Sequence, residues 1–292
     1  MRHRGALLAL IAALAILAAA CGGSEAPEGE DAPVGLEAVL AGAHAHSLMV
    51  DPDSGGRLWL GVHTGLYRSD DRGRSWRPSG LGSADAMNLA GGRAGPFWVA
   101  GHDVLERSSD GGESWESVRP DGLPGLDLHG FTVRAGEPDE VVAAVAGQGL
   151  YRSTDGGASF ALLSSEVGGS VFGMSMTEDG TLYAADAGRG LLVGPGGGAR
   201  FALRIEAPGL VAVAAHPERP DLVMAGGEPG VVVSTDGGRS WQTRFTEAGV
   251  SALAVDPGDP MRAYAVGTDA VLYESADSGR SWRAVGPEPA GT

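Results

Sequence analysis

The chain has 292 residues and a formal net charge of −16, with 37 acidic side chains against 21 basic ones. A surface this acidic repels the phosphates of nucleic acids and the headgroups of anionic lipids, which argues against both as partners. The single cysteine excludes an internal disulfide framework.

Residues 1–20 have the composition of a secretory signal peptide. A basic start is followed by a run of small and apolar residues that ends at Cys21. The cysteine after Leu17-Ala18-Ala19-Ala20 resembles the lipobox of bacterial lipoproteins, in which it is lipidated and becomes the N-terminus. This resemblance implies a lipid anchor at Cys21 and a place on the extracytoplasmic face of a cell membrane. Ala18 stands where leucine is commonest, so simple secretion is the alternative.

Residues 21–42 are expected to form a flexible acidic linker. Gly, Glu, Pro and Ser dominate its first part, without apolar periodicity. Within it, Leu36 to Leu40 is a candidate to pair with an edge strand of the following domain. That domain is expected over 43–286, which is long enough for one hydrophobic core, with a tail at 287–292.

One eight-residue pattern, Ser-x-Asp-x-Gly-x-x-Trp/Phe, recurs five times in this domain. Its acidic residues are Asp71, Asp110, Asp155, Asp236 and Asp277. A sixth copy, ending at Phe201, keeps only the glycine and the aromatic residue. The aromatic residues lie 39 to 45 residues apart, at positions 76, 115, 160, 201, 241 and 282. Repeats of this length with several short strands are typical of propeller blades. The sequence therefore predicts an all-β, six-bladed β-propeller with four antiparallel strands in each blade.

The first repeat gives the expected order of strands within a blade. They are His46–Val50, Arg57–Val62, Gly65–Ser69 and Ser75–Pro78. The repeated pattern then falls in the turn between the third and fourth strands. There the Asp carboxylate can accept turn N–H groups, the Gly can adopt a positive φ and the aromatic ring can pack between sheets. Since the copies cannot each be an active site, their acidic residues are expected to be structural.

The repeated pattern is the Asp-box, also called the BNR repeat. Over residues 43–286 the chain resembles bacterial sialidases, sortilin-like propellers and photosystem II assembly factors that carry it. It also resembles small bacterial BNR-repeat lipoproteins labelled glycosyl hydrolase, through Ala45-His46-Ser47-Leu48 and Gly65-Leu66-Tyr67-Arg68-Ser69. The resemblance implies the propeller fold, and it leaves the activity open because one fold hosts many functions.

Sialidase chemistry is not expected from these residues. A sialidase holds its substrate carboxylate with three inward arginines and uses a tyrosine nucleophile. Arg68, Arg107 and Arg152 look like such a triad, but all three occupy one repeat position just before the Asp-box. They are therefore expected on blade surfaces, and the tyrosines likewise follow the repeat.

Five of the seven histidines are predicted to meet at one rim, opposite to the Asp-boxes. Counting back from the aromatic positions places His63 and His102 in equivalent turns, and His44, His46 and His129 at the starts of inner strands. Imidazoles beside carboxylates suit Zn²⁺ or Cu²⁺. The alternatives are a rim that binds a protein or glycan ligand without a metal, and histidines that only hydrogen-bond loop backbones.

Carboxylates are predicted at the same rim. Glu228 and Asp269 take the positions equivalent to those two turn histidines in the fifth and sixth blades. The other acidic residues near the rim are Asp85, Asp103, Asp127 and Asp186. A glycosidase needs two carboxyl groups that flank a cleft, so Glu228 and Asp269 are the candidate catalytic pair. The longest repeat spacing, 45 residues, indicates an insertion around Gly122 to Leu128.

These observations favour a monomeric, lipid-anchored, extracytoplasmic propeller that binds a protein or glycan ligand or assists assembly. Two alternatives stay open. One is a glycoside hydrolase that uses rim carboxylates such as Glu228 and Asp269, and the other is a metal-binding surface protein that uses the rim histidines.

Overall fold

The computed structural model of the protein describes residues 32–91, 95–167 and 169–286. The expected signal peptide, Cys21 and the tail at 287–292 lie outside the described residues. The fold belongs to the unit that begins at Pro33. No helix in the described part of the chain has the length and hydropathy needed to cross a membrane.

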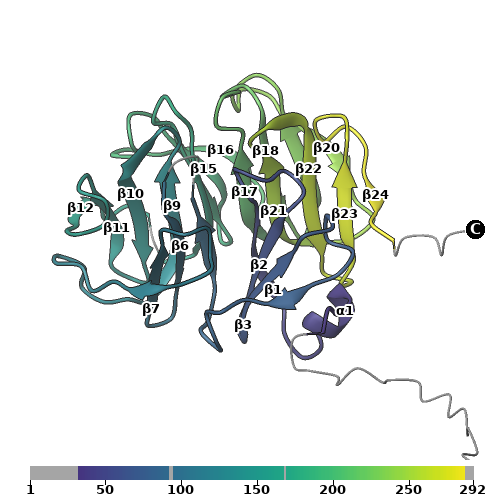
Figure 1. Cartoon of the computed structure of the whole chain (residues 1–292). Coiled ribbons are helices and arrows are strands. Elements are labelled where there is room, and N and C mark those ends of the chain that lie inside the picture. Colours follow the sequence, from purple (N-terminus) through teal and green to yellow (C-terminus); the bar gives the residue numbers. More distant parts are fainter. Residues whose placement is uncertain (1–31, 92–94, 168, 287–292) are drawn as a thin grey trace, which may run out of the picture. The chain divides into compact units, whose positions relative to one another are not determined.

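The described residues form six four-stranded antiparallel sheets, each built from strands consecutive in the chain (Figure 1). The first three blades contain β1 Ala45–Val50, β2 Leu58–Val62, β3 Gly65–Ser69, β4 Arg77–Pro78, β5 Asn88–Ala90, β6 Phe97–Gly101, β7 Val104–Ser108, β8 Glu116–Ser117, β9 Leu128–Arg134, β10 Glu137–Val145, β11 Gly149–Ser153 and β12 Ala161–Ser164. The last three contain β13 Val171–Met176, β14 Leu182–Asp186, β15 Gly190–Gly194, β16 Ala202–Glu206, β17 Leu210–Ala215, β18 Val223–Gly227, β19 Gly230–Ser234, β20 Gln242–Phe245, β21 Val250–Asp256, β22 Asp259–Gly267, β23 Leu272–Ser275 and β24 Arg283–Ala284.

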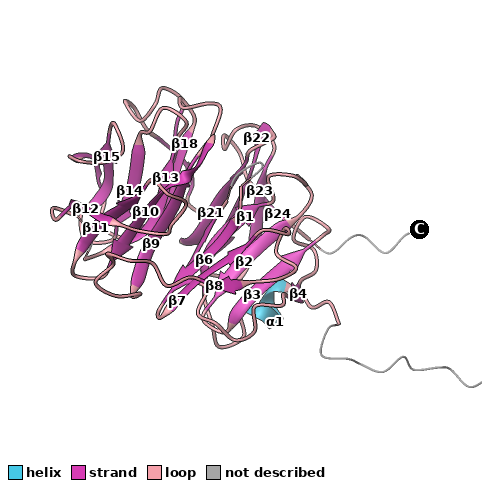
Figure 2. Cartoon of the chain, turned by 60° about the vertical axis from the view of Figure 1, so that its left-hand side comes forward, coloured by secondary structure: helices cyan, strands magenta, loops and turns pink. Residues whose placement is uncertain are grey.

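The first strand of each blade lines the centre of the ring. These inner strands contact one another in the order β1, β5, β9, β13, β17 and β21, and β21 contacts β1 again. β1 and β21 lie side by side near the middle of Figure 2. The predicted six-bladed propeller is thus confirmed. The first-blade strands begin and end within two residues of the predicted positions, with the fourth strand shortened to Arg77–Pro78.

The core lies between the blades rather than inside one of them. Second strands such as β2 and β6 are buried along their whole length, because each sheet is covered on both faces by its neighbours. They supply four of the largest fully buried side chains, Trp59, Trp98, Tyr183 and Tyr264. Short, continuous apolar runs are the sequence pattern that such two-sided burial requires.

Each Asp-box closes the turn before the fourth strand with hydrogen bonds of its own. In the first blade, Ser69 Oγ accepts the Gly73 N–H at 2.7 Å and donates to Asp71 Oδ1 at 2.7 Å. The Asp71 carboxylate also accepts the Ser75 N–H at 2.9 Å and the Ser75 hydroxyl at 2.6 Å. The Trp76 indole donates to the Gly73 carbonyl at 3.2 Å, and its ring is fully buried. The serine and aspartate thus fix the turn, and the ring enters the core.

The glycine of each complete Asp-box packs against the preceding blade. A Cβ on Gly112 would lie 2.5 Å from the Trp59 ring, and one on Gly157 would lie 2.8 Å from the Trp98 ring. Both glycines have a positive φ, +88° and +83°, which side chains rarely adopt. The remaining contacts of this kind join Gly73 to Leu272, Gly238 to Tyr183 and Gly279 to Met224. Four of the five complete repeats therefore need glycine both for the turn and for the contact between blades, whereas a Cβ on Gly238 would lie 3.5 Å from Tyr183, an ordinary contact.

The segment before the first blade is a helix, so the expectation that Leu36 to Leu40 pairs with a strand edge is wrong. α1 (Leu36–Val39) buries Leu36 and Val39 in the cluster that joins the first and last blades. The i, i+3, i+4 spacing of Leu36, Val39 and Leu40 gives one apolar helical face. Val34 instead forms the pairing, with two 2.8 Å backbone hydrogen bonds to Trp76. The linker expected over 21–42 thus includes a folded end.

Replacing Gly112 with alanine should destabilise the fold by about 3 kcal/mol, because backbone strain and overlap with Trp59 add together. Gly111→Ala is the matched control, since Gly111 also has a positive φ, +74°, but open space around it. It should cost about 1 kcal/mol. Urea unfolding of both variants measures the difference, and equal losses would contradict the packing role of Gly112.

The Asp-boxes should also set part of the acid sensitivity. Hydrogen bonds from serine hydroxyls lower the pKa of Asp110, Asp155 and Asp236 from 3.8 to about 2. Since these pKa values are depressed by folding, the stabilisation is present above about pH 4 and is lost as the pH falls toward 2.

Removing the donor hydroxyls should therefore weaken the response to acid. The combined variant Ser114→Ala, Ser159→Ala, Ser240→Ala should lose less stability than the unmodified protein between about pH 5 and about pH 2.5. Urea midpoints at the two pH values measure this loss. If both proteins lose the same stability, the serine hydroxyls are not the cause of the lowered pKa values of Asp110, Asp155 and Asp236.

Candidate functional site

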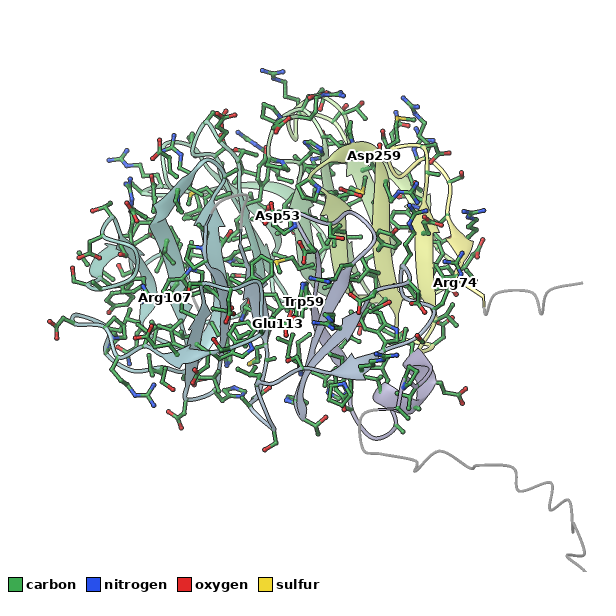
Figure 3. The ribbon with its side chains drawn as sticks, in the orientation of Figure 1. Asp53, Trp59, Arg74, Arg107, Glu113 and Asp259 are labelled. Atoms are coloured by element: carbon green, nitrogen blue, oxygen red, sulfur yellow. The ribbon has the colours of Figure 1, made fainter. Side chains whose placement is uncertain are left out.

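The histidines predicted to converge lie together where the inner strands begin and the second strands end. We call this face the histidine mouth. His44 precedes β1, His46 lies on it, and His63 follows β2. His102 follows β6 and His129 lies on β9. The face is opposite to the turns that join first to second strands, where Asp53 and Asp259 lie in the upper half of Figure 3.

Three donor atoms from the second and third blades converge on one point of the mouth. We call His102, Asp127 and His129 the His102 cluster. The Nε2 atoms of the two histidines are 3.3 Å apart. Asp127 Oδ1 is 3.3 Å from His102 Nε2 and 3.2 Å from His129 Nε2. The three atoms therefore form a nearly equilateral triangle.

This triangle has the dimensions of one face of a tetrahedral zinc site. With metal–ligand bonds of about 2.0–2.1 Å, neighbouring ligand atoms of a tetrahedral ion are about 3.3–3.4 Å apart. Imidazole nitrogen and carboxylate oxygen are also the donors that Zn²⁺ and Cu²⁺ accept. Half of each of the His102 and Asp127 side chains is exposed, 47% and 54%, so a fourth position is open to solvent.

Asp85 fixes the tautomers of two mouth histidines. Its Oδ2 lies 2.6 Å from His102 Nδ1, and its Oδ1 lies 3.1 Å from His63 Nδ1. Because a carboxylate only accepts hydrogen bonds, each Nδ1 carries the proton, and in the neutral ring each Nε2 keeps its lone pair. In the His102 cluster that lone pair faces a carboxylate oxygen and a second imidazole nitrogen. Three electron-pair donors that face one another need a proton or a metal ion between them.

Two glycines allow the β4–β5 connection to carry Asp85 to this place. A Cβ on Gly61, near the end of β2, would overlap the carbonyl oxygen of Ala86. A Cβ on Gly101, at the end of β6, would overlap the carbonyl oxygen of Asp85 itself. The connection therefore runs against bare backbone at two strand ends, and its carboxylate lies between the two turn histidines.

The long connection between the second and third blades brings in Asp127. Its backbone forms an isolated antiparallel bridge with His102. Its carbonyl accepts the Ala146 N–H at 2.9 Å, and the neighbouring Leu126 carbonyl accepts the Asp103 N–H at 3.0 Å. The insertion around Gly122 to Leu128 thus supplies one of the three donors of the His102 cluster.

A second group, the His46 cluster, consists of His44, His46 and His63 of the first blade. One nitrogen from each ring lies within 4.8 Å of the others. The ring centroids of His46 and His63 are 4.0 Å apart. Burial, together with the neighbouring His63, lowers the pKa of His46 to about 4. His46 is therefore neutral at physiological pH, and the neutral imidazole is the form that binds metals.

The mouth contains a pocket of about 510 Å³ that combines imidazoles with apolar side chains. His44 and His46 line it together with Met87, Phe172 and Val211. The Phe172 ring stacks on His129, with centroids 5.3 Å apart and planes inclined by 21°. Ligand pockets commonly have this composition, apolar walls with a few polar groups that fix orientation.

The other predicted rim carboxylates have different surroundings. Asp269 accepts the Tyr273 hydroxyl at 2.7 Å, and Asp186 pairs with Arg189 at 2.7 Å. Glu228 lies beside Gly209 and Gly249 and is not among the residues that line the mouth pocket. Among the described residues, no interaction joins Glu228 to Asp269. Glu228 and Asp269 therefore stay a candidate glycosidase pair on the sequence alone, because the two carboxyl groups of a glycosidase do not contact each other directly.

The three arginines that resemble a sialidase triad lie on third strands and pair with carboxylates there. Arg68 contacts Glu113 at 2.9 Å, and Arg107 contacts Glu116 at 3.2 Å. Arg152 contacts Glu140 at 2.7 Å. Figure 3 labels two of these residues, Arg107 and Glu113, on the blades. None of the three lines the mouth pocket.

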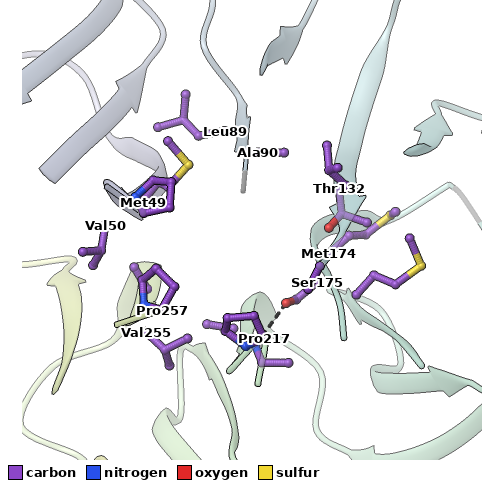
Figure 4. Close-up of a pocket in the computed structure, with 18 of the residues that line it drawn as sticks. Met49, Val50, Leu89, Ala90, Thr132, Met174, Ser175, Pro217, Val255 and Pro257 are labelled. Atoms are coloured by element: carbon purple, nitrogen blue, oxygen red, sulfur yellow. Dashed lines mark hydrogen bonds between the residues drawn. The ribbon is translucent and has the colours of Figure 1, made fainter. Parts of the chain in front are cut away.

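A second pocket, of about 310 Å³, lies in the centre of the ring toward the opposite face (Figure 4). All six inner strands contribute to it, with side chains such as Met49, Leu89, Met174 and Val255. Pro217 and Pro257 lie beside it, in or next to turns that follow inner strands. This pocket is not among the features predicted from the sequence. The sequence pattern that indicates this pocket is an apolar residue near the end of most inner strands.

Solved structures with the same fold have low sequence identity to this chain. The GH74 xyloglucanase from Xanthomonas campestris aligns with 82% of this chain and 46% of its own, at a TM-score of 0.58 and 18% identity. A structure of YCF48 bound to D1 peptide aligns with 83% of this chain and 81% of its own, at a TM-score of 0.55 and 19% identity.

A third similar structure is the extracellular domain of a putative one-component system from B. thetaiotaomicron. It aligns with 80% of this chain and 33% of its own, at a TM-score of 0.55 and 15% identity. This chain spans less than half the length of two GH74 enzymes that it matches. No family model and no curated protein matches the chain. At these identities the likenesses support the fold and leave the activity open.

Proposed function

We propose that this protein is a lipid-anchored β-propeller on the extracytoplasmic face of a cell membrane, whose histidine mouth binds a divalent transition-metal ion. The ion is Zn²⁺ or Cu²⁺, held by the His102 cluster. The observation that carries the proposal is the triangle of three donor atoms, with sides of 3.2–3.3 Å. An open zinc site has three protein ligands, and the size and composition of this triangle match such a set.

The open coordination position suggests how the mouth takes part in binding. Structural zinc sites use four protein ligands, whereas sites that receive a ligand use three. A carboxylate or imidazole of a protein or glycan partner would complete the coordination, and its apolar parts would contact Phe172 and Met87 in the mouth pocket. The structure of YCF48 contains a bound D1 peptide, a precedent for peptide binding by a similar fold.

Two variants test the metal site. Asp127→Asn and His129→Ala should each lower the zinc content of the purified full-length protein by one ion per chain. Elemental analysis after equilibrium dialysis against Zn²⁺ measures the content. Asp127→Asn removes a charged donor and keeps the shape, so its loss of zinc does not depend on the packing of His129 against Phe172.

Asp103→Asn is the control for charge. Asp103 adjoins His102 in the same turn but lies outside both clusters, and asparagine tolerates its positive φ of 56°. This variant should keep the zinc content of the unmodified protein. A protein that holds no zinc, or one whose content is the same in all three variants, would refute the proposal.

Cys21→Ser tests the anchor. Because the lipid would be attached at this thiol, the variant should move from the membrane fraction to the soluble fraction of the cell. Immunoblotting of the two fractions measures the change, and a variant with Ser24→Ala serves as the control. Membrane association that persists in Cys21→Ser would argue against lipidation at this residue.

A further inference from the structure

The His46 cluster and the His102 cluster are linked by one side chain. Asp85 contacts His63 of the first cluster with one carboxylate oxygen and His102 of the second cluster with the other, at 3.1 Å and 2.6 Å. The Asp85 side chain is 18% exposed, so protein atoms cover most of it. We propose that the His46 cluster is a second transition-metal site and that Asp85 is the positioning residue shared by the two sites. This inference rests on the proposed function of the mouth.

The donor set of the His46 cluster suits a metal ion. It consists of three imidazoles with no acidic side chain, and the nitrogens that can act as ligands lie within 4.8 Å of one another. Three histidines form a known ligand set of open zinc sites. The His46 Nε2 atom is buried and has no hydrogen-bond partner within the described residues. A buried nitrogen without a partner costs free energy that a bound ion would recover.

The geometry of Asp85 gives His63 the tautomer that a ligand requires. Asp85 accepts the proton on His63 Nδ1, so the lone pair of His63 lies on Nε2 and is free to bind an ion. A metal-binding histidine almost always donates its other ring N–H to a carboxylate, a carbonyl or a water. In this protein a single carboxylate does so for one histidine of each site.

The two sites are adjacent but separate. Asp85 contacts the Nδ1 atoms, which are the ring nitrogens on the side away from the proposed ligand atoms. With Nε2 of His63 and of His102 as ligand atoms, the covalent and hydrogen-bonded path between the two sites would run through His63, Asp85 and His102. The expected product is a pair of mononuclear sites, each with an open position at the mouth.

Zinc stoichiometry tests the second site. The purified full-length protein should bind two zinc ions per chain after equilibrium dialysis, and His46→Ala and His129→Ala should each bind one. His44→Ala removes another ligand of the same site. Because His44 is exposed, this variant should fold normally even if His46→Ala, at a partly buried position, does not. The combination of His46→Ala with His129→Ala should bind none, and circular dichroism checks that each variant is folded.

The possible results separate the second site from the proposed function. Zinc that is unchanged in both His46→Ala and His44→Ala overturns the second site. If His129→Ala loses one ion while His46→Ala and His44→Ala lose none, the second site is overturned and the proposed function stands. If His46→Ala and His44→Ala lose one ion while His129→Ala loses none, the second site is supported and a metal ion at the His102 cluster is overturned. A protein that binds no zinc overturns both.

Asp85→Asn tests the shared positioning role. An asparagine amide accepts at its oxygen but donates at its nitrogen, so it can satisfy the Nδ1–H of only one histidine. The other histidine should favour the Nε2–H tautomer, whose proton must move from Nε2 before that nitrogen can bind an ion. Zinc affinity at one of the two sites should therefore fall by about 10- to 100-fold, measured by competition with a chelating dye.

Imidazole ¹⁵N chemical shifts of the metal-free protein supply a readout that a purely structural role would not change. Both His63 and His102 should be Nδ1–H tautomers in the unmodified protein, and one of them should be Nε2–H in Asp85→Asn. Unchanged tautomers together with two unchanged zinc affinities would overturn the role of Asp85.

Discussion

The contact between an Asp-box glycine and the preceding blade determines the spacing of this propeller. The serine and aspartate of the box close the turn, and the closed turn holds the glycine backbone against a large side chain of the neighbouring sheet, such as Trp59 or Trp98. A methyl group at that position would separate the two blades. Blade spacing, burial of the second strands and the positions of the strand ends all depend on this contact.

The histidine mouth uses bare backbone in the same way at the opposite face. Gly61 and Gly101 let the β4–β5 connection run directly against two strand ends, and this close approach places Asp85 between His63 and His102. The histidine donors therefore come close together because the blades are close together, and the long connection between the second and third blades adds the Asp127 carboxylate. A rigid scaffold of this kind gives precise geometry to a binding site.

The sequence was sufficient to predict the blades because the same turn residues and the same aromatic residue recur in nearly every repeat. The spacing of the aromatic residues gave the number of blades, and one repeat gave the order of its strands. The convergence of five histidines at one rim followed from the same counting. The helix at Leu36–Val39 is difficult to predict because a single turn gives too short an apolar pattern to distinguish a helix from a strand. The division of the histidines into two clusters could not be predicted, since it depends on side-chain rotamers and on the path of the β4–β5 connection. The 45-residue spacing did indicate the insertion that carries Asp127.

Within residues 32–286 as described, each blade is a sheet of consecutive strands, and no strand is shared between the first blade and the last. The ring is therefore a linear array bent until its ends meet, and α1 covers the place where they meet. Asp85 spans the boundary between the first two blades, and His102 and Asp127 span the next. An ion at the His102 cluster would join the second blade to the third, two boundaries away from the closure. Slow opening of the ring, of the kind that hydrogen exchange detects, would then concentrate at the boundaries of the fourth and fifth blades.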